Sequence, residues 1–153
     1  MAVLATLCYL QQNGKTLMIF PTGKKDSHYN KKWNGVGGKF KSGETPEECV
    51  IREIKEETNL VAKNPQLAGI LTFPKMTGGE DWYVFVFVIK EFSGKLKASK
   101  EGKLDWFANE EILKLNLWEG DYVFLPWLFA GKFFLGEFVY DDGKLKNHSV
   151  TFY

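Results

Sequence analysis

The chain has 153 residues, of which 44% are hydrophobic, 16% aromatic and 25% charged, and its formal net charge is +1. A chain of this size and composition is expected to fold as one domain over residues 1–153, which excludes an intrinsically disordered protein. A charge so near zero also argues against polymeric nucleic acid as a partner, although it leaves a single nucleotide open as a ligand.

Signals for export or membrane insertion are missing from the sequence. The apolar start has no basic residue before Lys15, unlike a signal peptide, and no apolar run reaches the ~20 residues that span a membrane. Cys8 and Cys49 follow no metal or disulfide spacing, so both are expected in the core. These features predict a cytoplasmic protein with no membrane partner and no obligate protein partner.

The first third of the chain predicts a hairpin and a polar loop. Residues 2–11 are rich in β-formers, and Asn13-Gly14 after them is typical of a two-residue hairpin turn. Residues 15–20 are expected to form the returning strand. A polar loop follows and ends at Trp33.

A helix over residues 46–58 has sequence signals at both ends. Thr45 is a good N-cap, Pro46 suits the first helical position, and Glu48 completes a capping box with Thr45. Asn59 favours the left-handed backbone conformation that ends a helix.

The rest of the chain alternates strand signals with two short helices. Strands are expected over residues 67–73, 82–91, 104–108, 133–140 and 145–152. Helices are expected over residues 110–115, capped by Asn109, and over residues 122–129. The continuous apolar run within residues 82–91 indicates a strand buried on both faces. The pattern predicts a mixed α/β domain with helices packed on a central sheet.

Acidic residues are concentrated in the first helix. Six of the 19 acidic residues lie between Glu44 and Glu57. At ~100° per residue, Glu53, Glu56 and Glu57 fall within one arc of the helix, and their i, i+3, i+4 spacing predicts that their carboxylates converge. Convergent oxygens suit a hard divalent cation such as Mg²⁺ or Mn²⁺. The alternative is a solvated face in which Arg52 pairs with Glu56.

The loop before this helix is rich in glycine. Gly35, Gly37, Gly38 and Gly43 lie within nine residues, and glycines let a backbone approach a ligand closely. An acidic helix alone suits phosphate poorly. With bridging metal ions the loop and helix fit together, because the cations lie between carboxylates and phosphates.

The segment from residue 38 to residue 60 resembles the signature of the Nudix family, G-x5-E-x7-R-E-U-x-E-E-x-G-U, in which U is aliphatic. The matching residues are Gly38, Glu44, Arg52, Glu53, Ile54, Glu56, Glu57 and Leu60. Asn59 stands where the last glycine is expected, a small departure because Asn also tolerates a left-handed helix end. The chain is therefore identified as a member of the Nudix hydrolase family.

The resemblance implies an α/β/α sandwich around a central mixed β-sheet. It also implies a hydrolysis in which water attacks a phosphorus of a nucleoside diphosphate linked to another group, assisted by divalent metal ions. Glu56 and Glu57 would be metal ligands, Glu53 a ligand or the general base, and Arg52 the residue that orients the glutamates. Glu44 would support Arg52 structurally.

Two further metal ligands are expected outside the helix. Gly37 would contribute through the backbone of the glycine-rich loop. Glu101, ahead of Asp105-Trp106, matches a position that supplies an additional ligand in one Nudix subgroup; the alternative is a solvated loop acid.

That subgroup is the MutT-type oxidised-purine nucleoside triphosphatases, which two segments of the chain resemble. They are KKWNGVGGK from residue 31 and DWFANEEILKLNLWEGDYVFLPWLFAGKFFLGEF from residue 105. In the subgroup an Asn and an Asp read the purine edge, a Trp stacks on the ring, and an aromatic residue lies opposite. The corresponding residues here are Asn34, Asp121, Trp118 and Phe73. Lys24 is expected either to meet the triphosphate or only to solubilise its loop.

One departure bears on base preference. The mammalian members have two adjacent aspartates where this chain has Gly120-Asp121, so half of the recognition pair is missing, and Glu119 is offset by one residue.

Each pocket residue also has a simpler explanation. Trp118 and Phe73 could belong to the core, Asn34 could cap a turn, and Asp121 could be the N-cap of the second helix.

The sequence thus predicts a Mg²⁺-dependent nucleoside triphosphate pyrophosphatase that hydrolyses oxidised purine dNTPs, such as 8-oxo-dGTP, to the monophosphate and pyrophosphate. Such an enzyme sanitises the nucleotide pool and so serves DNA repair. The alternatives are a Nudix hydrolase of a dinucleoside polyphosphate or an unmodified dNTP, and a non-catalytic nucleotide sensor. The intact set of Glu53, Glu56 and Glu57 argues against the sensor.

Overall fold

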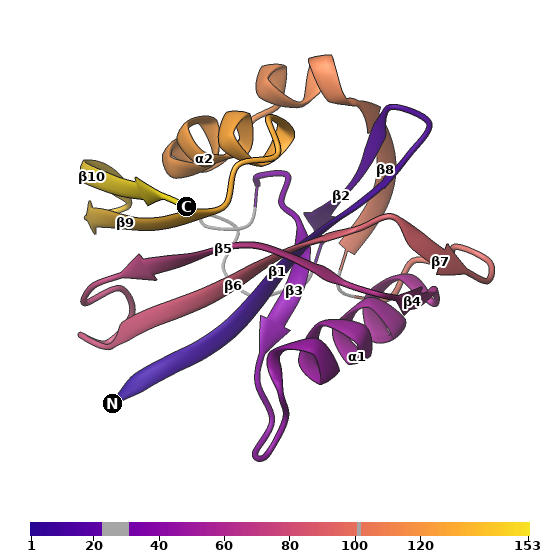
Figure 1. Cartoon of the computed structure of the whole chain (residues 1–153), viewed down its shortest axis with the longest axis horizontal. Helices are drawn as coiled ribbons and strands as arrows, with labels where there is room; N and C mark the ends of the chain where they lie inside the picture. The colour runs from indigo at the N-terminus through magenta and orange to yellow at the C-terminus, as the bar shows by residue number, and fades with distance from the viewer. Residues whose placement is uncertain (23–30, 101) are drawn as a thin grey trace.

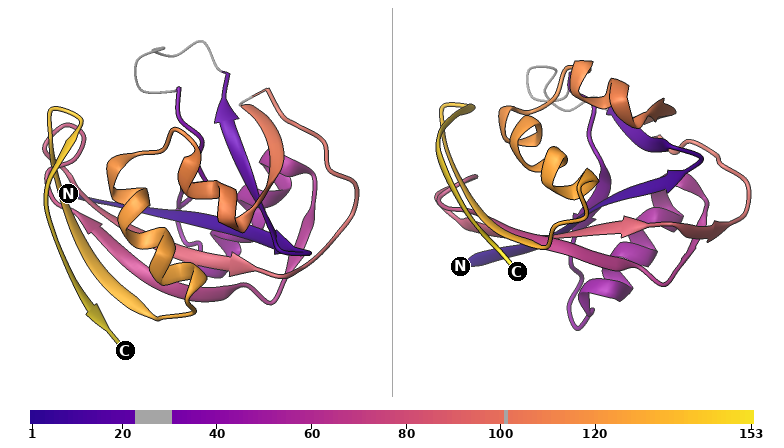
Figure 2. Two further views of the ribbon diagram at one scale, coloured as in Figure 1. Left: turned by 90° about the horizontal axis from the view of Figure 1, so that it is seen from above. Right: turned by 45° about the horizontal axis from the view of Figure 1, so that its top comes forward.

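A computed structural model describes residues 1–22, 31–100 and 102–153. Its middle layer is an eight-stranded mixed sheet. Helix α1 (Pro46–Thr58) packs on one face of this sheet and helix α2 (Glu119–Phe129) on the other (Figure 1, Figure 2). This arrangement is the α/β/α sandwich that the sequence predicts.

The strands follow the chain in a mixed order. The main sheet contains β1 (Ala2–Gln12), β2 (Lys15–Pro21), β3 (Val36–Lys39), β5 (Gln66–Phe73), β6 (Asp81–Ile89), β8 (Gly102–Ala108), β9 (Phe134–Asp141) and β10 (Lys144–Phe152). Their order is β10-β9-β5-β6-β1-β2-β8, and β3 pairs with β1 off this path. The pairs β1–β6 and β5–β9 are parallel, and the others are antiparallel. The short strands β4 (Val61–Lys63) and β7 (Glu91–Ser93) form a separate pair.

Two hydrophobic cores hold the three layers together. One lies between the sheet and α2 and includes Tyr9, Phe124 and Phe138, all at most 1% exposed. The other lies between the sheet and α1 and includes Val50 and Ile54, both fully buried. Burying a large apolar side chain stabilises a fold by about 1.5–3 kcal/mol, so these cores hold both helices in place.

Most predicted elements are confirmed, with differences at their ends. The second helix starts at Glu119, three residues earlier than predicted, so Asp121 lies in its first turn and the N-cap is Trp118. The predicted helix after Asn109 is a 3₁₀ segment, η1 (Asn109–Lys114), capped by Ala108. The side chain of Asn109 instead accepts a hydrogen bond from Thr16 Oγ1.

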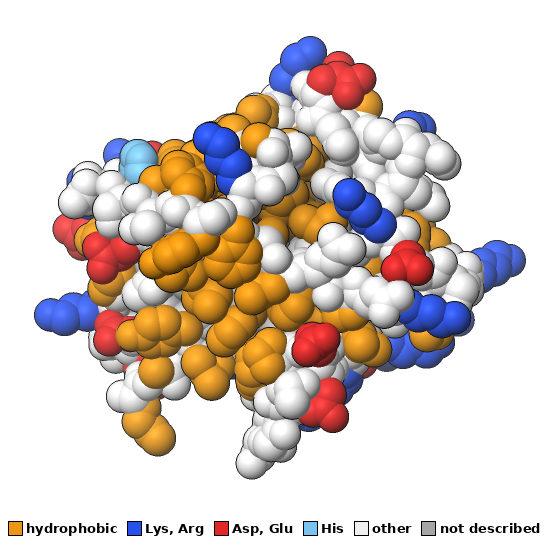
Figure 3. Space-filling view, in the orientation of Figure 1, with side chains coloured by type: hydrophobic (Ala, Val, Ile, Leu, Met, Phe, Trp, Pro, Cys, Tyr) orange, Lys and Arg blue, Asp and Glu red, His pale blue; other side chains and the backbone are white. Residues whose placement is uncertain are grey.

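Strand β6 is buried on both faces except near its start. Residues 84–89 are buried or half-buried, whereas Tyr83 is 36% exposed. Exposed apolar side chains gather on one face of the molecule (Figure 3). Leu4, Tyr83 and Leu135 are among the exposed large apolar residues. No helix in the described part of the chain is long and apolar enough to cross a membrane.

Candidate active site

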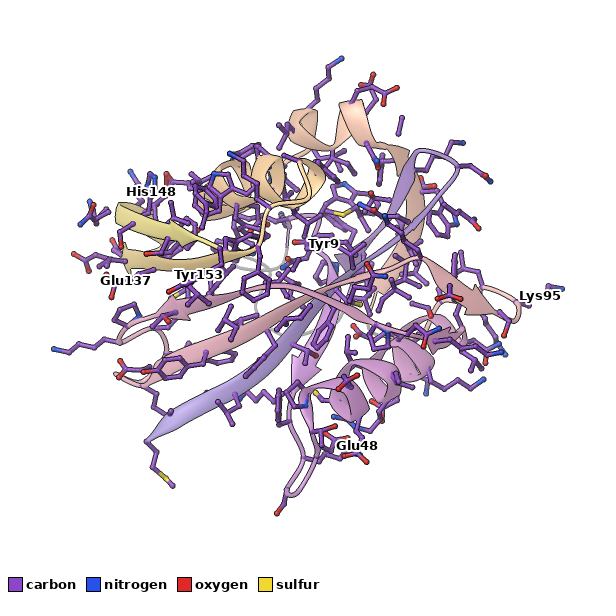
Figure 4. The ribbon with its side chains drawn as sticks, viewed as in Figure 1. Tyr9, Glu48, Lys95, Glu137, His148 and Tyr153 are labelled. Atoms are coloured by element: carbon purple, nitrogen blue, oxygen red, sulfur yellow. The ribbon has the colours of Figure 1, made fainter. Side chains whose placement is uncertain are left out.

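Helix α1 is held at both ends, which fixes the direction of its glutamates. Thr45 Oγ1 accepts a hydrogen bond from the Glu48 N–H over 3.1 Å, and Glu48 Oε1 accepts one from the Thr45 N–H over 2.9 Å. Glu48 lies at the N-terminal end of α1 (Figure 4). Asn59 ends the helix at φ 68° in the left-handed region, and its N–H donates to Lys55 O. The predicted capping box and C-cap are thus confirmed.

Arg52 is the centre of an ion-pair network on this helix. Its Nε and Nη2 donate to the two carboxylate oxygens of Glu44 over 2.6 and 2.9 Å. Its Nη1 donates to Glu53 Oε1 over 2.9 Å and to Glu56 Oε2 over 3.1 Å. The hydrogen bonds from Arg52 are the main cause that lowers the pKa of Glu44 to about 2. Arg52 therefore positions two glutamates while Glu44 holds Arg52.

Strand β3 lies directly against the glutamates. The Gly37 N–H donates to Glu57 Oε2 over 3.1 Å, and Glu57 is only 6% exposed. A Cβ on Gly38 would lie 2.5 Å from the carboxylate carbon of Glu53, and a Cβ on Gly37 would lie 2.0 Å from Thr6 O of β1. A side chain at Gly38 would therefore meet a glutamate, and a side chain at Gly37 would meet the backbone of the sheet.

The three glutamates lie together on the helix, but only the carboxylates of Glu53 and Glu56 converge, so the prediction that all three converge is wrong. Glu53 and Glu56 share Arg52, whereas Glu57 turns to the Gly37 amide. In the described part of the chain no three acidic, histidine or cysteine side chains are arranged to hold a metal ion. The helix fixes the positions of the Cα atoms, whereas the hydrogen-bond partners of each side chain, here Arg52 and the Gly37 amide, determine where its carboxylate lies.

The donor set still has the chemistry that a divalent cation needs. Glu53 and Glu56 already share one positively charged nitrogen, and Glu57 follows directly on the same helix. Hard carboxylate oxygens of this kind are the preferred ligands of Mg²⁺ and Mn²⁺. Glu101, the additional predicted ligand, and Lys24 lie outside the described residues.

A cleft adjoins the glutamate helix across strand β3. One part has a volume of about 450 Å³, and a wider adjoining part has a volume of about 730 Å³. These sizes are typical of small-molecule sites. Gly37 and Gly38 contribute to its lining, so the same two residues contact the glutamates and border the cleft.

All four predicted base-binding residues in the described part of the chain line this cleft: Asn34, Phe73, Trp118 and Asp121. They come from three separate segments. Asn34 precedes β3, Phe73 ends β5, and the other two lie at the start of α2. The backbone of Asn34 pairs with Ile19 in a β-bridge, which replaces the turn that was the simpler explanation. Asp121 is likewise not a helix cap.

Several cleft residues were missed from the sequence, among them two aromatic residues and a methionine. Trp82 lies at the start of β6 on the same face as Val84, Met76 lies in the turn before β6, and Tyr140 comes from the C-terminal hairpin. The alternation of β6 could have placed Trp82 beside the predicted pocket, since residues two apart share a face. Nothing local to Tyr140 indicates a pocket.

Buried polar atoms without partners cluster at the cleft. In the described part of the chain, three buried side-chain polar atoms make no hydrogen bond: Tyr9 Oη, Trp82 Nε1 and Asp121 Oδ2. Trp82 and Asp121 line the cleft, and the Tyr9 ring packs under Gly35 of its wall, near the middle of the molecule (Figure 4). Each unpaired buried group costs about 1–3 kcal/mol, a cost that a ligand bonding to it would offset.

The cleft contains a buried carboxyl group and has lysine side chains at its border. Burial raises the pKa of Asp121 to about 7, against the opposing effects of a backbone hydrogen bond at Trp118 and of the Lys32 ammonium. Lys32 Nζ lies 5.3 Å from the centre of the Trp118 ring, and Lys39 Nζ lies 5.3 Å from the centre of the Trp82 ring. Positive charge therefore borders an aromatic cleft that contains one carboxyl group able to titrate near neutral pH.

Comparisons with known proteins agree with this arrangement. A family profile for the NUDIX domain matches residues 1–128. The uncharacterized Nudix hydrolase YvcI of Bacillus subtilis is 35% identical over 140 residues, which cover 88% of this chain and 85% of that protein. An oxidized purine nucleoside triphosphate hydrolase of Danio rerio is 31% identical over 147 residues, covering 96% and 89%. The crystal structure of a MutT protein from Bacillus halodurans is similar with a TM-score of 0.83 and 30% identity, covering 97% of each chain.

The sandwich fold, the glutamate helix and the adjoining cleft define a hydrolase. The chain belongs to the Nudix family. Nudix hydrolases generally use divalent metal cations, which agrees with the carboxylate chemistry of α1.

Proposed function

We propose that the protein is a Mg²⁺-dependent nucleoside triphosphate pyrophosphatase that hydrolyses oxidised purine dNTPs, such as 8-oxo-dGTP, to the monophosphate and pyrophosphate. The observation that carries this proposal is the position of strand β3, whose Gly37 and Gly38 contact the glutamates and also border the cleft. A base in the cleft and a phosphate chain at the glutamates would then belong to one ligand. The similarity to the oxidized purine nucleoside triphosphate hydrolase of Danio rerio supports the same substrate class.

Glu53, Glu56 and Glu57 would hold Mg²⁺, with Mn²⁺ as a substitute, and Glu53 would be either a ligand or the general base. A bound divalent cation neutralises phosphate oxygens and lowers the pKa of a coordinated water. Arg52 would keep Glu53 and Glu56 in position, since one of its nitrogens bonds both. The Gly37 amide would hold Glu57 through its hydrogen bond.

The base would lie between aromatic side chains in the cleft. Trp118 and Phe73 would stack on the purine, a contribution worth about 1–3 kcal/mol per base and largely indifferent to its identity. Asn34 and Asp121 would read the purine edge, since an amide and a carboxyl together offer donors and acceptors. Lys24 would meet the triphosphate, and Glu101 would add a metal ligand.

The same proposal treats residues 1–153 as one cytoplasmic domain that sanitises the nucleotide pool and so protects DNA. Support comes from the core beneath α2, where Tyr9 of the first strand packs with Phe138 of the C-terminal hairpin. Cys8 and Cys49 are free and buried, as expected in a reducing compartment.

One observation favours a second candidate within the family. Gly120 takes the place of one expected aspartate, so the preferred nucleotide could instead be an unmodified dNTP or a dinucleoside polyphosphate. A sensor without turnover is disfavoured, because the arginine that positions the glutamates is itself fixed by Glu44.

The decisive experiment measures pyrophosphate release from oxidised and unmodified dNTPs and from dinucleoside polyphosphates, with and without Mg²⁺. We expect Mg²⁺-dependent turnover with 8-oxo-dGTP among the best substrates. Much faster cleavage of dinucleoside polyphosphates would refute the sanitising role, and no turnover of any nucleotide would refute the enzyme. Glu56→Gln should abolish kcat while nucleotide still binds, and Glu47→Gln, on an exposed part of the same helix, should act like the wild type.

A further inference from the structure

Tyr140 occupies the space beside Gly120 in the cleft. The Gly120 N–H donates to Tyr140 Oη over 2.6 Å. A Cβ built on Gly120 would lie 2.7 Å from the same oxygen, too close for both atoms to keep their places. A side chain at position 120 and the phenol of Tyr140 therefore exclude one another.

The phenol belongs to the wall of the base-binding cleft. Tyr140 lines the cleft together with Trp118 and Asp121, and its ring centre lies 6.1 Å from that of Phe73. The ring is thus held by an aromatic neighbour at one end and by the Gly120 amide at the other. It reaches the cleft from β9, whereas Asp121 reaches it from α2.

The hydroxyl hydrogen of Tyr140 is available to a ligand. The Gly120 N–H uses a lone pair of the oxygen, and in the described part of the chain no acceptor bonds to its hydrogen. Burial raises the pKa of Tyr140 to about 12, and the nearby Asp121 and Glu119 carboxylates act in the same direction. The phenol therefore stays protonated near neutral pH and offers a donor.

We propose that Tyr140 is a specificity-determining residue whose O–H donates to a carbonyl oxygen on the purine edge beside Asp121; this inference rests on the proposed function. A purine with a 6-oxo group, as in guanine, satisfies this donor. A purine with a 6-amino group, as in adenine, presents hydrogens there and leaves the O–H unpaired. The Gly120-Tyr140 pair thus replaces the missing aspartate with a neutral donor.

The first test compares Tyr140→Phe with the wild type on 8-oxo-dGTP and 8-oxo-dATP. The ring and its packing are kept, so only the hydroxyl is lost. We expect the ratio of kcat/KM values for the two substrates to fall about tenfold, mainly through a higher KM for 8-oxo-dGTP. Tyr83→Phe is the matched control, because Tyr83 lies between Trp82 and Val84 on β6 and points to the opposite face of the sheet.

The experiment distinguishes failure of the proposed function from failure of the role assigned to Tyr140. If the wild type hydrolyses neither substrate, the proposed function fails and this inference falls with it. If the wild type hydrolyses 8-oxo-dGTP and Tyr140→Phe keeps the wild-type ratio, the role of Tyr140 is refuted while the proposed function stands.

The second test uses the steric conflict at Gly120. Gly120→Ala should raise the KM for 8-oxo-dGTP in the wild type, because its Cβ displaces the phenol oxygen. In the Tyr140→Phe background the same substitution should cost much less, because that oxygen is gone. Equal costs in the two backgrounds would overturn the assignment, and circular dichroism of all four proteins establishes that each is folded.

Discussion

Arg52 and Glu44 form a two-point ion pair that joins the loop before α1 to the middle of the helix. Nε and Nη2 of Arg52 lie 2.6 and 2.9 Å from the two Glu44 oxygens, and the Glu44 side chain is only 15% exposed. The remaining terminal nitrogen, Nη1, is directed to Glu53 and Glu56. We therefore expect Glu44 to act on the site through Arg52, as a positioning residue.

Glu44→Gln should lower kcat by about 10–100-fold and leave the KM for nucleotide nearly unchanged. Gln keeps the shape but loses the charge and one acceptor, so Arg52 is held less firmly, and lost supporting contacts of this kind typically cost that much. Steady-state kinetics of the purified variant measures the effect. A raised KM with normal kcat would instead place Glu44 in direct contact with substrate.

The extent of α1 could be predicted from sequence because the residues that cap both of its ends are close to them in the chain. Thr45 with Glu48 and the left-handed Asn59 act within a few residues of the helix, and the structure has all three as expected. The directions of the three carboxylates could not be predicted, because Glu57 is bonded by the Gly37 amide of another strand.

The cleft residues also divide into some that could be predicted from sequence and some that could not. Asn34 and Trp118 were found through a family resemblance, whereas Trp82 and Tyr140 were missed. Their positions depend on strand register between segments distant in sequence: Trp82 pairs with Phe73 of β5, and Tyr140 pairs with Leu145 of β10. Register is a tertiary property that a motif does not contain.

The neighbouring glycines of β3 should respond differently to alanine. In Gly37→Ala the new Cβ would lie 2.0 Å from a backbone oxygen, Thr6 O, which the sheet holds in place. We expect a loss of about 1–3 kcal/mol in the free energy of unfolding. In Gly38→Ala the Cβ meets the end of the Glu53 side chain, which can move. We expect near-normal stability and a large loss of kcat.

Denaturant unfolding and steady-state kinetics of the two variants measure these effects. Each variant is the control for the other, because both add one methyl group to the same strand. Equal losses of stability would contradict the packing of β3 between β1 and α1.

Asp121 should make stability depend on pH. Its pKa in the folded protein is raised by burial from the ordinary 3.8 to about 7, so folding favours the protonated form. The stabilisation is fully present below about pH 4 and is lost as pH rises through 7. Relative to Asp121→Asn, whose side chain does not titrate, the wild type should lose roughly 4 kcal/mol of unfolding free energy between pH 4 and pH 8.

Urea unfolding of both proteins at intervals between pH 4 and pH 8 measures this difference. Parallel pH profiles would show that the Asp121 carboxyl is solvated in the folded protein.

Trp118→Ala should weaken the binding of all purine nucleotides by a similar factor. Trp118 lines the cleft with a half-buried ring and makes no side-chain capping bond to α2, so its removal chiefly removes a stacking surface. Stacking is worth about 1–3 kcal/mol per base, which corresponds to a rise of about 5–150-fold in Kd. Calorimetric titration with 8-oxo-dGMP and dAMP measures both affinities.

Trp106→Phe is the control, because Trp106 stacks on Phe92 in the core beneath α1. A loss confined to one of the two bases would mean that Trp118 takes part in base selection, which we assign to the polar groups of the cleft.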